Sequence, residues 1–303
     1  MDIRIVILSA SLLLVACSAS QSSSVSANNS RHHPARISCQ QTDVKPYVRI
    51  YVKGDYRYID SNGIPASYGP FPNAGNPNPV CPADHHFRVP RYPAKSSKIT
   101  WTWGSHRLWM GVALNGVPFE MSTNEYWHYG KGRETGKFSD WMYVATAKLV
   151  GLDSSNGHPQ PPGVYHYHRL PASLYRRITN DAKVPSKMVL IGYAADGFPI
   201  YGLYVHKNPD ELSSPMVLAK SGYQLKSGQR PAGDPPGNYD GTFFEDYTYQ
   251  KQSTLLDECN GRYGKTSEYP QGIYYYVITE NYPYLPLCLK GTIDASFMKT
   301  RRR

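Results

Sequence analysis

Apolar and polar residues alternate along much of the chain, as expected for β-strands that are buried on one face. The clearest such segments cover residues 47–52, 188–193, 201–205 and 272–279. Helical patterns cover 140–149 and the short 172–178, and 212–219 is ambiguous because Pro215 argues against a continuous helix. Gly and Pro, at 25 residues each, supply turn positions between the strands. The pattern therefore predicts an all-β class, mainly β with a few short helices, folded as one sandwich-like domain.

Two kinds of internal repetition accompany the strands. Asx-Gly-x-Pro occurs three times, and Asn-Gly or Asp-Gly favours the type I′ turn of a hairpin: Asn62–Pro65, Asn115–Pro118 and Asp196–Pro199. In addition, residues 162–168 are similar to 271–277, with Tyr275 and Val277 in place of two histidines. This similarity favours a domain of two related halves. The alternative is a chance likeness between two tyrosine-rich strands.

The N-terminal segment has the features of a secretory leader. Residues 5–15 are mostly apolar, and they end in Leu14-Val15-Ala16-Cys17, which resembles a bacterial lipobox. The alternative is an ordinary signal peptide that is cleaved near Ala16. We expect a lipoprotein signal peptide over 1–16, a flexible tether over 17–36, the β domain over 37–293 and a basic tail over 294–303. Lipid on Cys17 would anchor an exported protein to a membrane of the bacterial cell envelope.

The remaining four cysteines and the net charge also fit an exported protein. An even number of cysteines in an exported chain suggests disulfides, with three possible pairings. We favour the two that close local loops, Cys39–Cys81 and Cys259–Cys288. The formal net charge is +10, but the only basic run is at 301–303. We therefore expect no nucleic-acid partner, and attribute the charge to attraction toward anionic lipid or cell-surface polymer.

Histidines carry the clearest candidate chemistry. His166 and His168 lie in a short predicted strand bounded by Pro and Gly, so their side chains share one face and those of Tyr165 and Tyr167 share the other. His158 precedes them across a Pro-rich turn, and a loop of this length can bring its ring back over that face. Three imidazoles suit zinc or copper. The alternative is that these histidines only form hydrogen bonds.

Carboxylates and one further histidine are candidates for the remaining metal position. Asp196 is the first choice, because it lies in one of the Asx-Gly turns. Asp257 and Glu258 form an acidic pair, for which the alternative is a solvated turn beside a cysteine. His128 is a reserve ligand. Because ligating histidines must be neutral, affinity for the metal is expected to fall as the pH drops through about 6.5.

Taken in order, these segments resemble the YHYH-domain family of exported proteins. The resemblance runs from Tyr47 to Thr292, and its segments are 61–65, 71–78, 111–119, 158–161, 165–168, 192–202, 256–262 and the strand that contains Tyr274. Two positions depart from the family pattern. Gly157-His158-Pro159-Gln160-Pro161 stands where Ala-His-Val-Gln-Pro is frequent, and Tyr275 stands where the family often has a further histidine. The second departure puts a site in the C-terminal half in doubt.

Two functional hypotheses follow from the sequence. The first is a lipid-anchored metal-binding protein, or a metalloenzyme, whose metal is bound by histidines. The second is a metal-free envelope lipoprotein, either structural or with an aromatic surface for a small molecule, glycan or peptide. A glycosidase with Asp196 and Glu258 as paired carboxylates is a further option, although no spacing requires it. Gly-x-Ser-x-Gly, the motif of a serine hydrolase, does not occur in the sequence.

Overall fold

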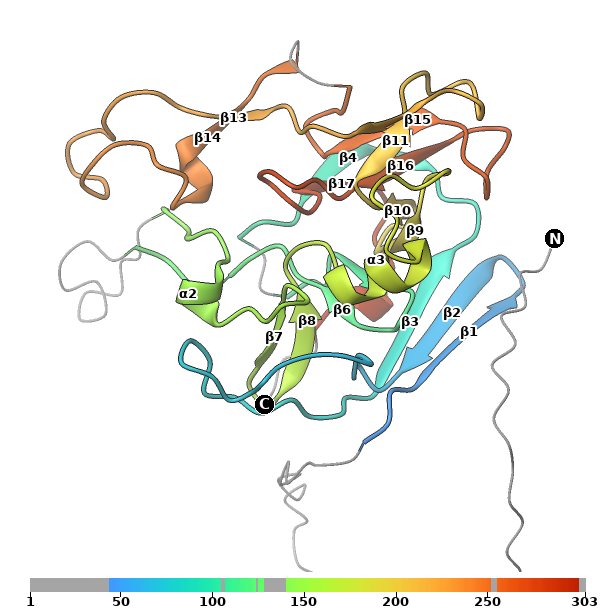
Figure 1. Cartoon of the computed structure of the whole chain (residues 1–303), viewed down its shortest axis with the longest axis horizontal. Coiled ribbons are helices and arrows are strands. Elements are labelled where there is room, and N and C mark those ends of the chain that lie inside the picture. Colours follow the sequence, from blue (N-terminus) through green and yellow to red (C-terminus); the bar gives the residue numbers. More distant parts are fainter. Residues whose placement is uncertain (1–43, 105–106, 124, 128–139, 252–254, 300–303) are drawn as a thin grey trace, which may run out of the picture. The chain divides into compact units, whose positions relative to one another are not determined.

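The computed structural model describes residues 44–104, 107–123, 125–127, 140–251 and 255–299 (Figure 1). The chain divides into two compact units, 1–38 and 39–303, and all described residues belong to the second. The predicted signal peptide and tether, with Cys17, lie outside the described residues. So do Cys39, His128 and the last four residues of the predicted basic tail.

An eight-stranded sheet contains most of the repeated motifs. Its strand order is β15-β16-β10-β9-β5-β6-β8-β7. In chain order these strands are β5 (Gly111–Ala113), β6 (Pro118–Phe119), β7 (Gly157–Gln160), β8 (Val164–Tyr167), β9 (Leu190–Ala194), β10 (Pro199–Tyr201), β15 (Gly261–Gly264) and β16 (Ile273–Val277). Among the largest fully buried side chains are tyrosines from three of these strands: Tyr165, Tyr167, Tyr201, Tyr275 and Tyr276.

Smaller sheets complete the described part of the molecule. A three-stranded antiparallel sheet consists of β1 (Val48–Lys53), β2 (Tyr56–Ser61) and β3 (His85–Pro90). Three two-stranded sheets pair β4 (Lys95–Trp101) with β17 (Cys288–Gly291), β11 (Tyr204–His206) with β12 (Met216–Leu218), and β13 (Tyr223–Leu225) with β14 (Tyr247–Tyr249). The helices are α2 (Ala147–Val150), α3 (Ala172–Thr179), and the 3-10 turns η1 (Phe244–Asp246) and η3 (Ala295–Phe297). The predicted mainly β, sandwich-like class is confirmed.

The large sheet has an internal two-fold pattern. Its central strands β5 and β9 are antiparallel, and each continues through a hairpin into β6 or β10. Strand β6 then runs parallel to β8, which pairs antiparallel with β7. In the other half β10 runs parallel to β16, which pairs antiparallel with β15. The two related halves expected from the sequence are therefore visible in the strand order itself.

The hairpins that begin each half are formed by two of the three Asx-Gly-x-Pro segments. In the first, Gly116 N–H donates to the Ala113 carbonyl, and Ala113 N–H donates to the Val117 carbonyl. The second hairpin has the same two bonds: Gly197 N–H donates to the Ala194 carbonyl, and Ala194 N–H donates to the Phe198 carbonyl. Only the glycines of these turns have positive φ, whereas a type I′ turn needs two such residues. The predicted type I′ turn is therefore wrong, because the loops have three residues and follow the type I turn with a bulged glycine.

Local predictions had mixed outcomes. Helix α3 and strands β1, β9 and β16 form where they were expected, and the disulfide Cys259–Cys288 is present. Cys81 is also disulfide-bonded, and its predicted partner Cys39 lies outside the described residues. The expected helix over 140–149 is wrong over its first part, because Met142 and Tyr143 form β-bridges and only Ala147–Val150 is helical. The expected strand over 201–205 is divided between β10 and β11.

Candidate metal centre

The three histidines meet on one face of the β7–β8 hairpin. His158 lies in β7 and pairs directly with His166 in β8, so that their side chains are cross-strand neighbours on the same face. His168 follows β8, and its backbone N–H donates to the Asn156 carbonyl. His158 thus reaches the other two histidines as part of a strand, and not by the folded-back loop expected from the sequence.

The Nε2 atoms of the three imidazoles converge. His168 Nε2 lies 2.9 Å from His158 Nε2 and 3.0 Å from His166 Nε2. All three side chains are buried, and they form a group of potential metal ligands. Two ligand nitrogens at about 2.05 Å from a tetrahedral zinc ion would be about 3.3 Å apart. Movements of a few tenths of an ångström would therefore bring these rings to coordination distance.

A backbone carbonyl sets the orientation of the His166 ring. His166 Nδ1 lies 3.1 Å from the Val164 carbonyl oxygen, which can only accept a hydrogen bond. Nδ1 therefore carries the proton, and in the neutral ring Nε2 presents its lone pair to the cluster. His168 Nδ1 is buried and has no hydrogen-bond partner.

The side-chain amide of Asn76 contacts Nδ1 of His158. The Asn76 amide nitrogen lies 2.8 Å from His158 Nδ1, and it also contacts the carbonyl oxygens of Val150 and Pro159. An amide nitrogen can only donate, so at this distance His158 Nδ1 accepts, and the neutral ring carries its proton on Nε2, which faces His168. For Nε2 to bind a metal, the proton has to move to Nδ1, where the Val150 carbonyl is an available acceptor.

Hydrogen bonds alone cannot satisfy the contacts between the three Nε2 atoms. His168 Nε2 has close contacts with two nitrogens, but it can carry only one proton, and neutral His166 has none to offer at Nε2. At least one of these two contacts therefore lacks a hydrogen bond in a cluster of three neutral rings. A cation at the common point would accept all three lone pairs, so the donor set fits a transition metal that prefers imidazole.

Burial keeps the three rings neutral. Desolvation lowers the pKa of His158 to about 4, and it lowers the pKa values of His166 and His168 well below 6.5. For His166 and His168, repulsion by neighbouring charges acts in the same direction. Protons therefore compete for these nitrogens only at a lower pH than the value of about 6.5 expected from the sequence.

An ion pair that was not predicted from the sequence lies beside the histidines. Glu120 directly follows β6, is buried, and has its Oε2 atom 3.4 Å from His166 Nε2. Its Oε1 atom accepts a short hydrogen bond from Lys299, whose Nζ atom also lies 3.8 Å from the centre of the Trp109 ring. Burial raises the pKa of Glu120 and lowers that of Lys299, while the pairing opposes both shifts.

The predicted carboxylate ligands are elsewhere. Asp196 Oδ2 accepts hydrogen bonds from the Tyr276 hydroxyl and from Gly291 N–H, and Asp196 is not a member of the histidine group. Burial raises its pKa to about 6. Asp257 accepts from the Tyr274 hydroxyl, and Glu258 pairs with Lys290. These carboxylates therefore support the second half of the sheet, while His128 lies outside the described residues.

The opposite face of β8 carries tyrosines that fix the hairpin. Tyr165 and Tyr167 are fully buried, and the Tyr165 hydroxyl donates to Asp153 Oδ2. Asp153 Oδ1 accepts from Gly157 N–H, which ties the start of β7 to the same carboxylate. A side chain at Gly157 would meet the Tyr165 ring at 2.4 Å. The sequence thus needs glycine immediately before His158 so that the tyrosine can pack there.

The second half repeats this framework without the histidines. Asp257 accepts from Gly261 N–H and from the Tyr274 hydroxyl, as Asp153 does in the first half. The two hairpins have the same register: Gly157 pairs with Tyr167 in the first, and Gly261 pairs with Tyr276 in the second. Gly157 and Gly261 are therefore equivalent positions.

The positions that correspond to His158 and His166 are then Arg262 and Tyr275. Arg262 Nε donates to the Tyr275 hydroxyl at 2.6 Å. The position that corresponds to Glu120 is Tyr201, whose ring contacts that of Tyr275. A guanidinium and two phenols thus fill the space where the first half gathers imidazoles and a carboxylate.

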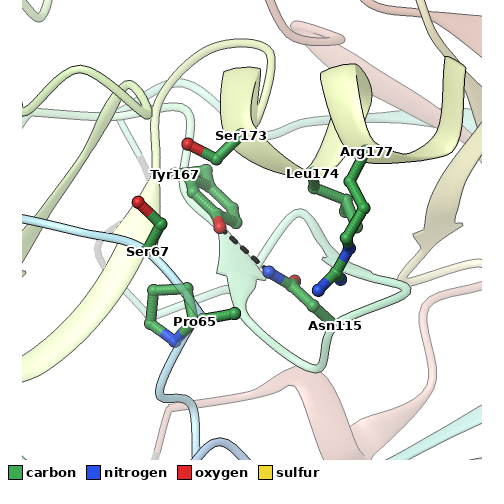
Figure 2. A pocket seen from close by; sticks show the side chains of 8 residues that line it. Pro65, Ser67, Asn115, Tyr167, Ser173, Leu174 and Arg177 are labelled. Carbon is green, nitrogen blue, oxygen red and sulfur yellow. Dashed lines mark hydrogen bonds between the residues drawn. The ribbon is translucent and has the colours of Figure 1, made fainter. Parts of the chain in front are cut away.

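Figure 2 shows a small pocket that Tyr167 helps to line. In the sequence, Tyr167 lies between His166 and His168. Its volume is about 100 Å³, and it is lined by polar and apolar residues, among them Pro65, Ser67, Asn115, Ser173 and Arg177. Asn115 donates to the Tyr167 hydroxyl across it, as Figure 2 shows. Typical ligand pockets are about 300–1,000 Å³, so this one offers little room for a glycan or peptide.

Comparison with known proteins places the chain in a family. The fold and the histidine cluster define a β-rich protein with a potential metal centre on one hairpin of a two-fold sheet. The chain matches the YHYH protein family over residues 86–291, and it belongs to that family. Comparisons with curated proteins and with solved structures gave no match. Within the described residues, no helix is both long and apolar enough to cross a membrane.

Proposed function

We propose that this protein binds a transition metal, zinc or copper, through His158, His166 and His168. The observation that carries the proposal is the convergence of three buried Nε2 atoms, two of whose separations are 2.9 and 3.0 Å. Neutral rings cannot satisfy this arrangement with hydrogen bonds alone, whereas a cation can. The Val164 carbonyl at His166 Nδ1 adds support, because it orients the Nε2 lone pair of that ring inward.

The burial of the cluster favours a tightly held metal. Side chains of the three histidines are 9% exposed or less. Three protein ligands leave a fourth position, which in catalytic zinc sites is taken by water or substrate. The proposed function is therefore a buried metal centre with three histidine ligands.

Titration with zinc and with copper tests this proposal. Calorimetry on the metal-free full chain should give one site, and His166→Ala and His168→Ala should each abolish it. His206→Ala is the matched control, because His206 is equally buried, donates from Nδ1 to the Ser214 carbonyl, and is not in the cluster. Equal binding by the wild type and both cluster variants would refute the proposed ligands.

We also propose that the protein is exported and anchored through lipid on Cys17 in the bacterial cell envelope. Support comes from the apolar segment that ends in Leu14-Val15-Ala16-Cys17 and from the disulfide Cys259–Cys288, which suits an oxidising compartment. Cys17→Ser should move the protein from the membrane fraction to the soluble fraction. Membrane association that is unchanged by Cys17→Ser would contradict the lipid anchor.

A further inference from the structure

We propose that Glu120 is the fourth ligand of the metal, and that Lys299 holds this carboxylate until the metal displaces it. The inference rests on the metal centre proposed above. It starts from Glu120 Oε2, which is buried, lies near the Gln160 side chain without a hydrogen bond of normal geometry, and lies 3.4 Å from His166 Nε2. That distance is close to the separation of about 3.3 Å between two ligands of a tetrahedral zinc ion.

The second oxygen of Glu120 shows what restrains it. Oε1 accepts from Lys299, and Glu120 is not part of the group in which all ligand atoms are mutually close. The carboxylate therefore lies at the border of the cluster, turned toward the ammonium group. Released from Lys299, it could rotate by a short distance toward the convergence point of the histidines.

Charge balance indicates that Lys299 would leave. The Glu120–Lys299 pair is neutral as a unit and buried, with side-chain exposures of 5% and 16%. A divalent cation added beside the intact pair would give the buried region a net charge of +2, which is costly in a medium of low dielectric constant. If the ammonium moves to solvent, the net charge falls to +1, and the carboxylate gains the metal as its partner.

The backbone allows this exchange without unfolding. Lys299 N–H donates to the Arg107 carbonyl, and Met298 forms a β-bridge with Leu108, so the main chain is held beside this segment. Only the long side chain has to swing. Its ammonium also contacts the buried Trp109 ring at 3.8 Å, and this cation–π contact would be given up together with the ion pair.

The test uses Co²⁺ as a spectroscopic probe of the full chain. Glu120→Gln should weaken Co²⁺ binding by about 10- to 100-fold, and its visible absorption spectrum should differ from that of the wild type. Glu245→Gln is the matched control, because Glu245 also has a buried unpartnered oxygen but hydrogen-bonds to Met142 N–H. Lys299→Met should bind Co²⁺ more tightly than the wild type.

A measurement on the unmodified protein complements the variants. Saturation with Co²⁺ should increase the rate at which an amine-reactive reagent acylates Lys299, as read by peptide mass spectrometry. An unchanged rate at Lys299, or wild-type affinity and spectrum in Glu120→Gln, would overturn the inference and leave the three-histidine centre standing. If the wild type binds neither Co²⁺ nor zinc, the proposed function itself fails.

Discussion

Alanine at either of two equivalent glycines should separate stability from metal binding. Gly157 and Gly261 begin β7 and β15, and the Cβ of an alanine would lie 2.4 Å from the Tyr165 ring or 2.2 Å from the Tyr274 hydroxyl. Real Cβ atoms do not approach other atoms so closely, so a buried tyrosine must shift in each variant. The two variants perturb the same local framework, but only Gly157 adjoins a histidine of the cluster.

The expected magnitude follows from overpacking of a dense interior. Forcing an extra methyl group into such a site typically costs about 1–3 kcal/mol of stability. In a domain of this size, each kcal/mol lowers the melting temperature by about 2–4 °C. Gly157→Ala should also shift Tyr165 and its neighbour His166, and thus weaken metal binding. Gly261→Ala should leave the metal affinity at the wild-type value.

Two measurements decide the outcome. Urea denaturation of the metal-free proteins gives the loss in free energy of unfolding, and zinc titration gives the affinity. The account predicts similar losses of stability for Gly157→Ala and Gly261→Ala, with a loss of affinity only in the first. Equal losses of zinc affinity in both variants would refute the assignment of the metal to the first half. Wild-type stability in both would refute the packing argument.

Two further predictions concern stability. His85 is buried, and desolvation lowers its pKa to about 4. Between about pH 6.5 and 4 the unfolded chain therefore binds a proton that the folded chain does not, and stability falls as the pH drops through this window. At about pH 5 the loss in free energy of unfolding is about 2 kcal/mol. In urea denaturation, the free energy of unfolding should depend less on pH in His85→Gln than in the wild type. An unchanged pH dependence would contradict the assignment to His85. Replacing Cys259 and Cys288 by Ser opens a loop of sequence separation 29 and should cost about 3–4 kcal/mol. Thermal unfolding of this double variant at the wild-type temperature would exclude such a contribution.

Much of the site was predictable because its residues are close in sequence. The alternation around His166 and His168 placed both on one strand face, and the similar segment at 271–277 indicated a second half. The repeat of Asp-x-x-Asn-Gly at 153–157 and 257–261 was also visible in the sequence. It would have placed His158 on a paired strand, as the counterpart of Arg262 in the other half, and not on a loop.

Other parts depend on contacts between distant segments. Glu120 lies 46 residues from His166 in sequence, and only the parallel pairing of β6 with β8 brings it to the histidines. Lys299 arrives from the C-terminal segment through the bridge between Leu108 and Met298. Asp196 seemed a ligand because it is a turn carboxylate, but Tyr276 and Gly291 satisfy it instead. Local sequence patterns carry no information about these pairings.

Elemental analysis of the full chain, purified without an affinity tag, tests the central claim most directly. The account predicts about one zinc or copper ion per chain, which is lost in a His166→Ala, His168→Ala double variant and retained in His206→Ala. Absence of both metals from the wild type, together with a melting temperature that neither metal raises, would contradict it.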